Sequence, residues 1–240
     1  MMRDLRWWNY VAPAIFGSFL FWIYPQTNWD HALIAPYFDP QLHFYWRDQL
    51  FLNTVMHDGL KIALQLIGVA TFFYWLYAKK IGSTEQRRWL WLWLGIVFSA
   101  LSVSILKRFS IHACPWDLTR YGGFAAELAL FADLPSGTQP GRCFPGGHAS
   151  GGYALLALYF AFIGSNTRLA YLSLALGLFV GSLMGWTQMM RGAHFMSHNL
   201  WTLWVVWLVL LAWYWVWPPV ADAKCASPVM TGKLAVQHAL

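Results

Sequence analysis

Long apolar segments are the feature that most limits how this chain folds. Six such segments, each near the roughly 20 residues that cross a bilayer as a helix, are separated by polar or basic stretches. They cover residues 8–25, 59–78, 89–106, 148–164, 168–187 and 199–217. Of the 240 residues 58% are hydrophobic and 11% charged, whereas about a quarter are charged in soluble domains. The sequence therefore predicts an all-α, polytopic membrane protein with six transmembrane helices and a short periplasmic cap.

The six segments and their loops account for residues 1–217, which predicts one membrane domain followed by a polar cytoplasmic tail over 218–240. The first segment lacks a small-residue cleavage site, so we expect it to remain as a helix and not to be a signal peptide. The stretch from Phe44 to Leu52 is expected to be either an amphipathic helix on the membrane surface or a capping loop.

The distribution of basic residues predicts the orientation in the membrane, because cytoplasmic loops carry an excess of Lys and Arg. Lys61 lies just inside the second span. Nine basic residues fall on one side: Arg3, Arg6, Lys79, Lys80, Arg87, Arg88, Arg168, Lys224 and Lys233. Six fall on the other: Arg47, Lys107, Arg108, Arg120, Arg142 and Arg191. Both termini are therefore expected in the cytoplasm. The histidine-bearing loops are expected in the periplasm of a bacterial inner-membrane protein.

The net charge of +6 does not indicate a nucleic-acid partner, because the basic residues are spread thinly at the ends of apolar segments. Five of the six outer basic residues, from Lys107 to Arg191, lie in the loops that carry most of the histidines. Positive charge kept against the topology rule predicts that these loops bind an anion, such as a lipid phosphate.

Three outer segments carry candidate chemistry. The first, 107–117, begins with Lys107 and Arg108, which either neutralise a phosphate or anchor a helix end. The second, 142–150, places Gly146, Gly147 and His148 at a helix start, where free N–H groups favour an anion. The same residues would also suit a turn with a capping histidine.

The third outer segment, 187–199, contains His194 and His198, four residues apart and so on one face if the segment is helical. Together the three segments bring basic residues and histidines to one membrane face. This set suits attack on a phosphate ester. Cations neutralise the phosphate oxygens, one histidine attacks phosphorus, and a second protonates the leaving oxygen. No metal or other cofactor is needed.

These segments resemble the motifs of the type 2 phosphatidic acid phosphatase superfamily, K-x6-R-P, P-S-G-H and S-R-x5-H-x3-D. The matching stretches are Lys107 with Cys114-Pro115, then Pro145-Gly146-Gly147-His148, then Gly192 to His198. The resemblance covers Lys107 to about Thr202. It implies a six-helix lipid phosphatase in which His194 is the nucleophile, His148 the general acid and Lys107 a phosphate ligand.

Three motif positions differ from the family pattern: Cys114 and Gln188 replace arginines, and His198 replaces an aspartate. We expect Arg191 to substitute for one arginine, because it follows Gln188 by about one helical turn, and Arg142 or Arg120 for the other. Asp117 is the candidate for the missing carboxylate. A second alignment makes His198 the nucleophile, but it misplaces the Gly-x-His stretch.

The cysteines allow two interpretations. Cys114 and Cys143 lie in two outer loops, where a disulfide would join the first motif to the second. The alternative is a zinc site formed by His112, Cys114 and Cys143 with His148 or His194. Cys225 lies in the tail and is expected to be a free thiol.

The predicted function is hydrolysis of a lipid phosphate or diphosphate. Candidate substrates are undecaprenyl diphosphate, phosphatidylglycerol phosphate, phosphatidic acid and the phosphates of lipid A. Two alternatives stay open. A phosphotransferase would pass the phosphate from the same phosphohistidine to a second lipid. A non-catalytic relative would bind or move a phospholipid, and the changes at Cys114, Gln188 and His198 are what suggest it.

Overall fold

The computed structural model describes residues 5–220, which contain helices, turns and loops but no named strand. Arg3, Lys224, Lys233, Cys225 and nearly all of the predicted tail lie outside these residues. The α-helices are α1 (Trp8–Ser18), α2 (Trp29–Ile34), α3 (Leu60–Lys80), α4 (Gln86–Phe109), α5 (Gly147–Tyr153), α6 (Leu156–Phe162), α7 (Thr167–Met190) and α8 (Met196–Val216). Short π or 3-10 helices are η1 (Phe19–Ile23), η2 (Tyr24–Gln26), η3 (Ala35–Tyr37), η4 (Phe51–Gly59), η5 (Pro115–Asp117) and η6 (Thr119–Tyr121). The all-helical prediction is confirmed for this part of the chain.

Four of the predicted spans coincide with helices long and apolar enough to cross a membrane. These helices are Phe51–Lys80, Gln86–Phe109, Thr167–Met190 and Met196–Val216. The other two predicted spans are built from shorter pieces. Residues 8–26 pass from α1 through η1 to η2, and residues 147–162 form α5 and α6 with a turn between them. Their crossing of the membrane therefore stays a prediction.

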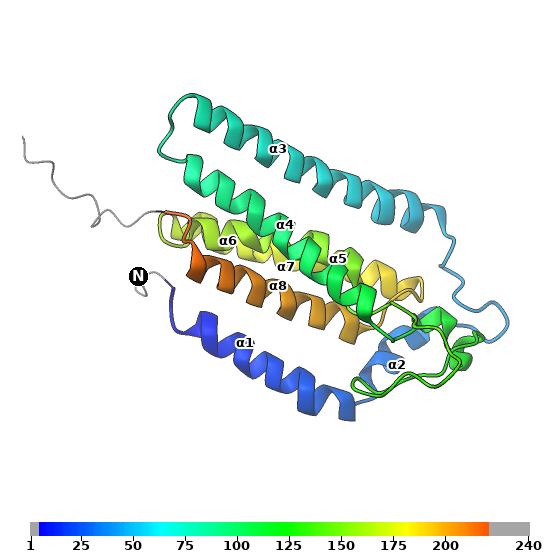
Figure 1. The fold of residues 1–240 in the computed structure, drawn as a ribbon. Coiled ribbons are helices and arrows are strands. Elements are labelled where there is room, and N and C mark those ends of the chain that lie inside the picture. Colours follow the sequence, from blue (N-terminus) through cyan, green and yellow to red (C-terminus); the bar gives the residue numbers. More distant parts are fainter. Residues whose placement is uncertain (1–4, 221–240) are drawn as a thin grey trace, which may run out of the picture.

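The helices form an elongated bundle with α5 and α6 packed against α7 (Figure 1). The central core is aromatic, and Trp91, Tyr153, Tyr159 and Phe160 are almost completely buried in it. Helix α3 lies at the edge, mainly against α4, and only 6% of its most apolar stretch is buried. This exposure is what a helix facing lipid requires, because bilayer hydrocarbon can cover apolar side chains as a protein core does.

Glycines allow the closest helix contact, between α5 and α7. A Cβ atom placed at Gly152 would overlap the backbone of Gly181, and one placed at Gly181 would overlap the ring of Tyr153. Small residues let helix backbones approach closely, which increases their van der Waals contact. This contact holds α5, which carries His148, against α7, which leads to His194.

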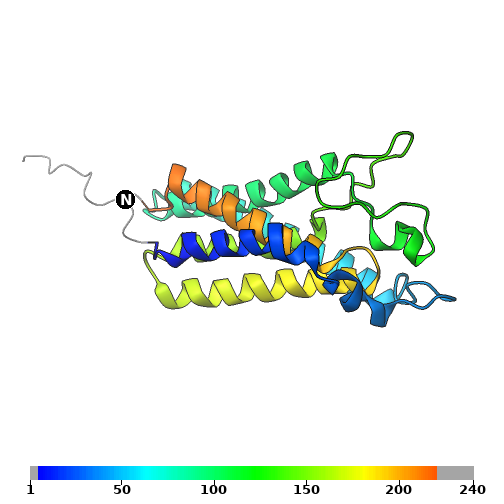
Figure 2. The same ribbon diagram turned by 90° about the horizontal axis from the view of Figure 1, so that it is seen from below.

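The loops that carry the candidate chemistry share one end of the bundle. Two views show α2 and the long connection between α4 and α5 at the end where α7 meets α8 (Figures 1 and 2). The α3–α4 and α6–α7 turns lie at the opposite end (Figure 1). The predicted grouping of the outer segments is therefore present.

The stretch from Phe44 to Leu52 is not an amphipathic helix. Residues 44–48 form a bend and turns, and the next helix runs from Phe51 through η4 into α3. The helix that contains the second predicted span thus begins eight residues before residue 59, where the sequence predicts its start. The first part of the stretch is therefore a loop, whereas Phe51 and Leu52 begin the next helix. The ring of Phe44 is buried against Gly192 beside the candidate site.

The α5–α7 contact predicts that Gly181→Ala destabilises the protein. The added methyl group would overlap Tyr153, and overpacking of this kind costs about 1–3 kcal/mol. Gly68→Ala in α3 is the matched control, because a Cβ there meets no atom within 4 Å. Thermal unfolding in detergent should show a lower midpoint for Gly181→Ala only. Equal midpoints for the two variants would contradict this packing.

Candidate active site

A cavity of about 750 Å³ opens between α3, α4, α5 and α7. Its polar lining includes Lys107 from α4, His148 from α5, and Arg191 and His194 from the α7–α8 connection. The three outer segments therefore meet at a single cavity, as their sequences predict. Its apolar lining extends along α3 and α4 and includes Leu64, Ile96, Val97, Leu101 and Met184.

His194 lies in the short turn between α7 and α8, and its side chain is buried. Gly192 has a φ of 71°, a left-handed conformation that glycine adopts without strain. The N–H groups of Gly192 and Ala193 donate to the carbonyls of Met189 and Gln188. A Cβ at Gly192 would overlap the ring of Phe44. Backbone geometry and packing together fix the position of the His194 ring.

His194 and His198 meet, but not as neighbours on a helix. Helix α8 begins at Met196, so the predicted shared helical face is wrong. The turn instead brings Nδ1 of His194 within 3.2 Å of Nδ1 of His198. One of these nitrogens must donate and the other accept. If His194 donates, its Nε2 keeps a lone pair for chemistry.

Burial keeps His194 neutral. Desolvation is the main cause that lowers its pKa well below the ordinary value, and His198, Lys107 and His148 lower the pKa further because positive charge disfavours protonation. A neutral imidazole is the form that acts as a nucleophile. The surroundings of His194 therefore suit a nucleophile better than a resting acid.

His148 lies beside His57, a histidine that no sequence motif singles out. The ring of His57 stacks on His148 with a centroid separation of 4.4 Å and an interplanar angle of 7°. His148 Nε2 lies 3.4 Å from the carbonyl oxygen of Met56. Lys61 follows His57 by about one turn and also lines the cavity. The spacing of His57 and Lys61 along one helix could have identified both residues, since ionisable residues in membrane helices usually face an interior cavity.

Lys107 and the glycines of the second motif lie together. A Cβ at Gly147 would be 3.6 Å from Nζ of Lys107, so this glycine leaves the ammonium group uncovered. Gly146 N–H donates to the carbonyl of His198, and the Thr202 hydroxyl donates to the carbonyl of Gly146. These bonds tie the second motif to the third.

Arg191 lies beside the motif position that has lost its arginine. Its Nη1 donates to Oε1 of Gln188 at 3.1 Å, and its Nε donates to the carbonyl of Arg47. Nε2 of Gln188 is buried and has no hydrogen-bond partner within the described residues, although Gln188 lines the cavity. An unpaired buried donor is costly, and this one belongs to a residue that lines the cavity.

Six of the predicted site residues do not line this cavity. Two of them, Gly146 and His198, lie directly behind it through the contacts described above. Arg108, Arg120 and Arg142 are exposed at the surface. The carboxylate of Asp117 accepts a hydrogen bond from the indole of Trp116 at 3.0 Å. The structure therefore brings neither a substitute for the first motif arginine nor this carboxylate to the cavity, whereas His57 and Lys61 add positive charge or polarity there.

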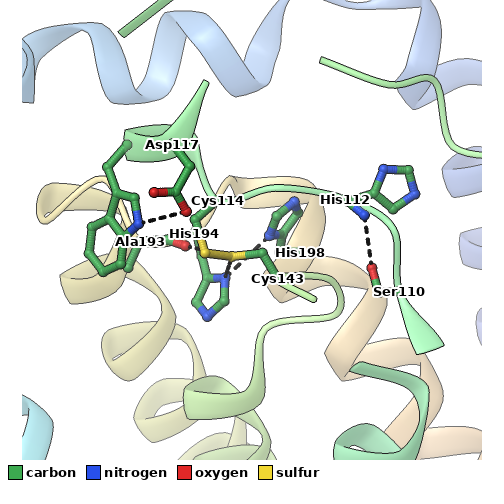
Figure 3. The surroundings of a disulfide bond; sticks show 9 residues. Ser110, His112, Cys114, Asp117, Cys143, Ala193, His194 and His198 are labelled. Atoms are coloured by element: carbon green, nitrogen blue, oxygen red, sulfur yellow. Dashed lines mark hydrogen bonds between the residues drawn. A yellow bond between two sulfur atoms is a disulfide. The ribbon is translucent and has the colours of Figure 1, made fainter. Parts of the chain in front are cut away.

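A disulfide joins Cys114 and Cys143, with their Cα atoms 5.1 Å apart. Sγ of Cys143 lies 3.1 Å from the carbonyl oxygen of Ala193 and 3.5 Å from Nδ1 of His194 (Figure 3). The bond therefore links the loops of the first two motifs and also contacts the third. His112, from the zinc alternative, instead points to the carbonyl of Leu130 and lines a separate cavity.

Comparison with known proteins yields one match. The family model of the PAP2 superfamily matches residues 88–221, more than half of the chain. The matched region contains all three motif segments. No curated protein and no solved structure matches the chain.

The environment of His194 predicts an unusual titration. Because its pKa is lowered, His194 should stay neutral as the pH falls from 7 to 6, where an ordinary histidine with pKa about 6.5 gains its proton. NMR of histidine-labelled protein should show this, with His194→Gln used to assign the signal. Since the unfolded chain would bind that proton, stability should fall below about pH 6.5. Titration of His194 at or above pH 6.5 would contradict the prediction.

Proposed function

Because the chain belongs to the PAP2 superfamily, whose members are phosphatases, we propose that it removes a phosphate from a membrane lipid phosphate or diphosphate. The reaction takes place at the periplasmic face of a bacterial inner membrane and passes through a phosphohistidine on His194, without a metal. The observation that carries the proposal is the cavity in which Lys107, His148, Arg191 and His194 meet at one end of an apolar channel.

The phosphate binds at the polar end of the cavity. Lys107, Lys61 and Arg191 supply positive charge, and the free Nε2 donor of Gln188 supplies a hydrogen bond. Arginine makes two parallel contacts to phosphate oxygens, which fixes orientation as well as charge. Neutralising these oxygens lowers the barrier to attack, since it stabilises charge in the transition state.

His194 attacks phosphorus through Nε2, and the bond from phosphorus to the lipid oxygen breaks. His148 gives a proton to that leaving oxygen and so becomes the base for the second step. A water molecule then attacks the phosphohistidine while His148 takes its proton, and inorganic phosphate leaves with His194 restored. Two histidines in these roles balance the reaction.

His198 takes the place of the family's aspartate as the partner of the nucleophile. It accepts a hydrogen bond from His194 Nδ1–H across the 3.2 Å contact, which leaves the proton on His194 and keeps the Nε2 lone pair directed away from His198. It brings no negative charge to stabilise the cation that forms on His194. We infer that the charge of the phosphate itself provides that stabilisation.

The apolar lining holds the lipid tail. Helix α4 lines the cavity from Ile96 to Lys107, eleven residue steps that span about 16 Å at 1.5 Å per residue. The facing part of α3 contributes Leu64 and Gly68. A cavity that runs from charged groups into a predicted membrane span suits a substrate with a phosphate head and a hydrocarbon tail.

Loss of either cavity histidine should stop phosphate release. In detergent with EDTA, His194→Ala should lower kcat by at least about 10³-fold and His148→Ala by about 10²–10⁴-fold, the usual value of a general acid. His43→Asn is the control, because it lies outside the cavity and asparagine tolerates its φ of 55°. Phosphate release from phosphatidic acid and undecaprenyl diphosphate is the measurement.

The result also separates the alternatives. Phosphate appearing on an added acceptor lipid instead of in water would identify a transferase. Tight lipid binding without turnover would identify a non-catalytic relative. Full activity of His194→Ala would refute the proposed nucleophile.

Substitution of an arginine in the cavity should lower kcat/KM more than substitution of an arginine at the surface. Arg191→Gln removes a charged group from the cavity and should lower kcat/KM by about 10- to 100-fold, equivalent to the roughly 1.5–3 kcal/mol of a charged hydrogen bond. Arg120→Gln removes an exposed arginine and should change kcat/KM less than about twofold, as surface charges contribute little. Equal losses in the two variants would show that Arg191 acts only through overall charge.

A further inference from the structure

One buried cysteine and two buried histidines lie close together beside the cavity. Sγ of Cys143, a ring nitrogen of His194 and a ring nitrogen of His198 all lie within 4.8 Å of one another. The two histidine Nδ1 atoms are 3.2 Å apart, and His194 Nδ1 is 3.5 Å from the sulfur. In a tetrahedral zinc site, bonds of about 2.0 Å to nitrogen and 2.3 Å to sulfur place ligand atoms about 3.3–3.6 Å apart. The two contacts of His194 already have these separations, and the third pair of ligand atoms lies within 4.8 Å.

The disulfide prevents Cys143 from binding zinc. The ligand that binds zinc is a deprotonated thiolate, and a sulfur in a disulfide is uncharged. Reduction by a phosphine breaks the Cys114–Cys143 bond. The phosphine gives two electrons and takes an oxygen atom from water, and the water's two protons go to the two sulfurs. Both thiols then lie beside His194 and His198.

We propose that the reduced protein binds a borderline-soft divalent cation such as Zn²⁺ through Cys143, His194 and His198, with Cys114 as the fourth ligand. Two cysteines and two histidines form a closed zinc site of the common Cys2His2 composition. Binding releases the two thiol protons. That such binding stops catalysis rests on the proposed function, but the site itself does not.

The surrounding groups decide which ions fit. Lys107 lies close enough to His194 to act on its charge, so a cation meets positive charge from that side. Two thiolates cancel the charge of the dication and offset this repulsion. Mg²⁺ and Ca²⁺ prefer oxygen ligands, and the group offers none, so they should not compete.

Zinc at this position would disable the nucleophile through its tautomer. A neutral imidazole that binds metal through Nδ1 carries its proton on Nε2. The Nε2 of His194 would then have no lone pair for attack on phosphorus. The expected result is an enzyme that is active when its disulfide is formed and inhibited by zinc when the disulfide is reduced.

Cobalt titration tests the site without any need for activity. The full chain in detergent, with Cys225→Ser to remove the tail thiol, is treated with a chelator and desalted. Co²⁺ is then added with and without a phosphine reductant. The reduced protein should bind one Co²⁺ per chain with a sulfur-to-cobalt charge-transfer band and tetrahedral d–d bands. The disulfide form should show neither.

Two variants provide a matched pair that needs no reductant. Cys114→Ser leaves Cys143 as a free thiol and should give the sulfur-to-cobalt band directly. Adding Cys143→Ser to it removes only that sulfur and should abolish the band. Adding His198→Ala to Cys114→Ser should weaken binding by more than about 100-fold, since even groups behind the ligands are worth about 10–100-fold. Size-exclusion profiles establish that each variant is folded.

The outcomes separate this proposal from the proposed function. Absence of the charge-transfer band from both the reduced protein and Cys114→Ser, in folded samples, would refute the site. The band without loss of phosphate release at one equivalent of Zn²⁺ would refute the inhibition. Absence of phosphate release from the disulfide form on every lipid would count against the proposed function, while the cobalt spectrum still decides the site.

Discussion

The contact between Nδ1 of His194 and Nδ1 of His198 is the interaction on which the rest of the site depends. It sets the direction of the His194 ring, and it holds only because the α7–α8 turn is fixed on all sides. Gly192 closes the turn in a left-handed conformation, Phe44 packs against it, and the carbonyl of Gly192 accepts from Trp116 N–H. The nucleophile is thus positioned by backbone geometry and loop packing.

The departures from the family motifs have different consequences. At Gln188 the positive charge of the motif arginine is missing, and Arg191 supplies a positive charge nearby. Arg191 donates a hydrogen bond to Gln188 and lines the same cavity. At Cys114 the arginine is replaced by half of a disulfide that contacts the nucleophile's own neighbourhood. At His198 an acceptor is kept but its negative charge is not. At Gln188 and Cys114, a neighbouring arginine and a disulfide take the place of the motif arginines. At His198, the site loses the negative charge beside the nucleophile.

The cavity connects this chemistry to the membrane. Its charged end lies where α4, α5 and the α7–α8 turn meet, and its apolar walls follow α3 and α4 into their predicted spans. Because α3 is hardly covered by the rest of the protein, this side of the bundle faces lipid if the spans cross the bilayer. The exposed apolar surface of α3 and the length of the cavity thus have one physical explanation.

The sequence by itself determined the helical class, the family and the three segments that meet, because apolar length and motif spacing are local properties of the chain. It also indicated the pairing of Cys114 with Cys143, though only as one of two interpretations. It did not determine that Tyr45 to Asp48 form turns, that His57 and Lys61 line the cavity, or that Asp117 does not. Those outcomes depend on which surfaces of distant segments come into contact. Only the tertiary structure decided how His194 meets His198. Helix α8 begins after His194, and the turn before it is fixed by contacts with Phe44 and Trp116, which come from distant parts of the chain.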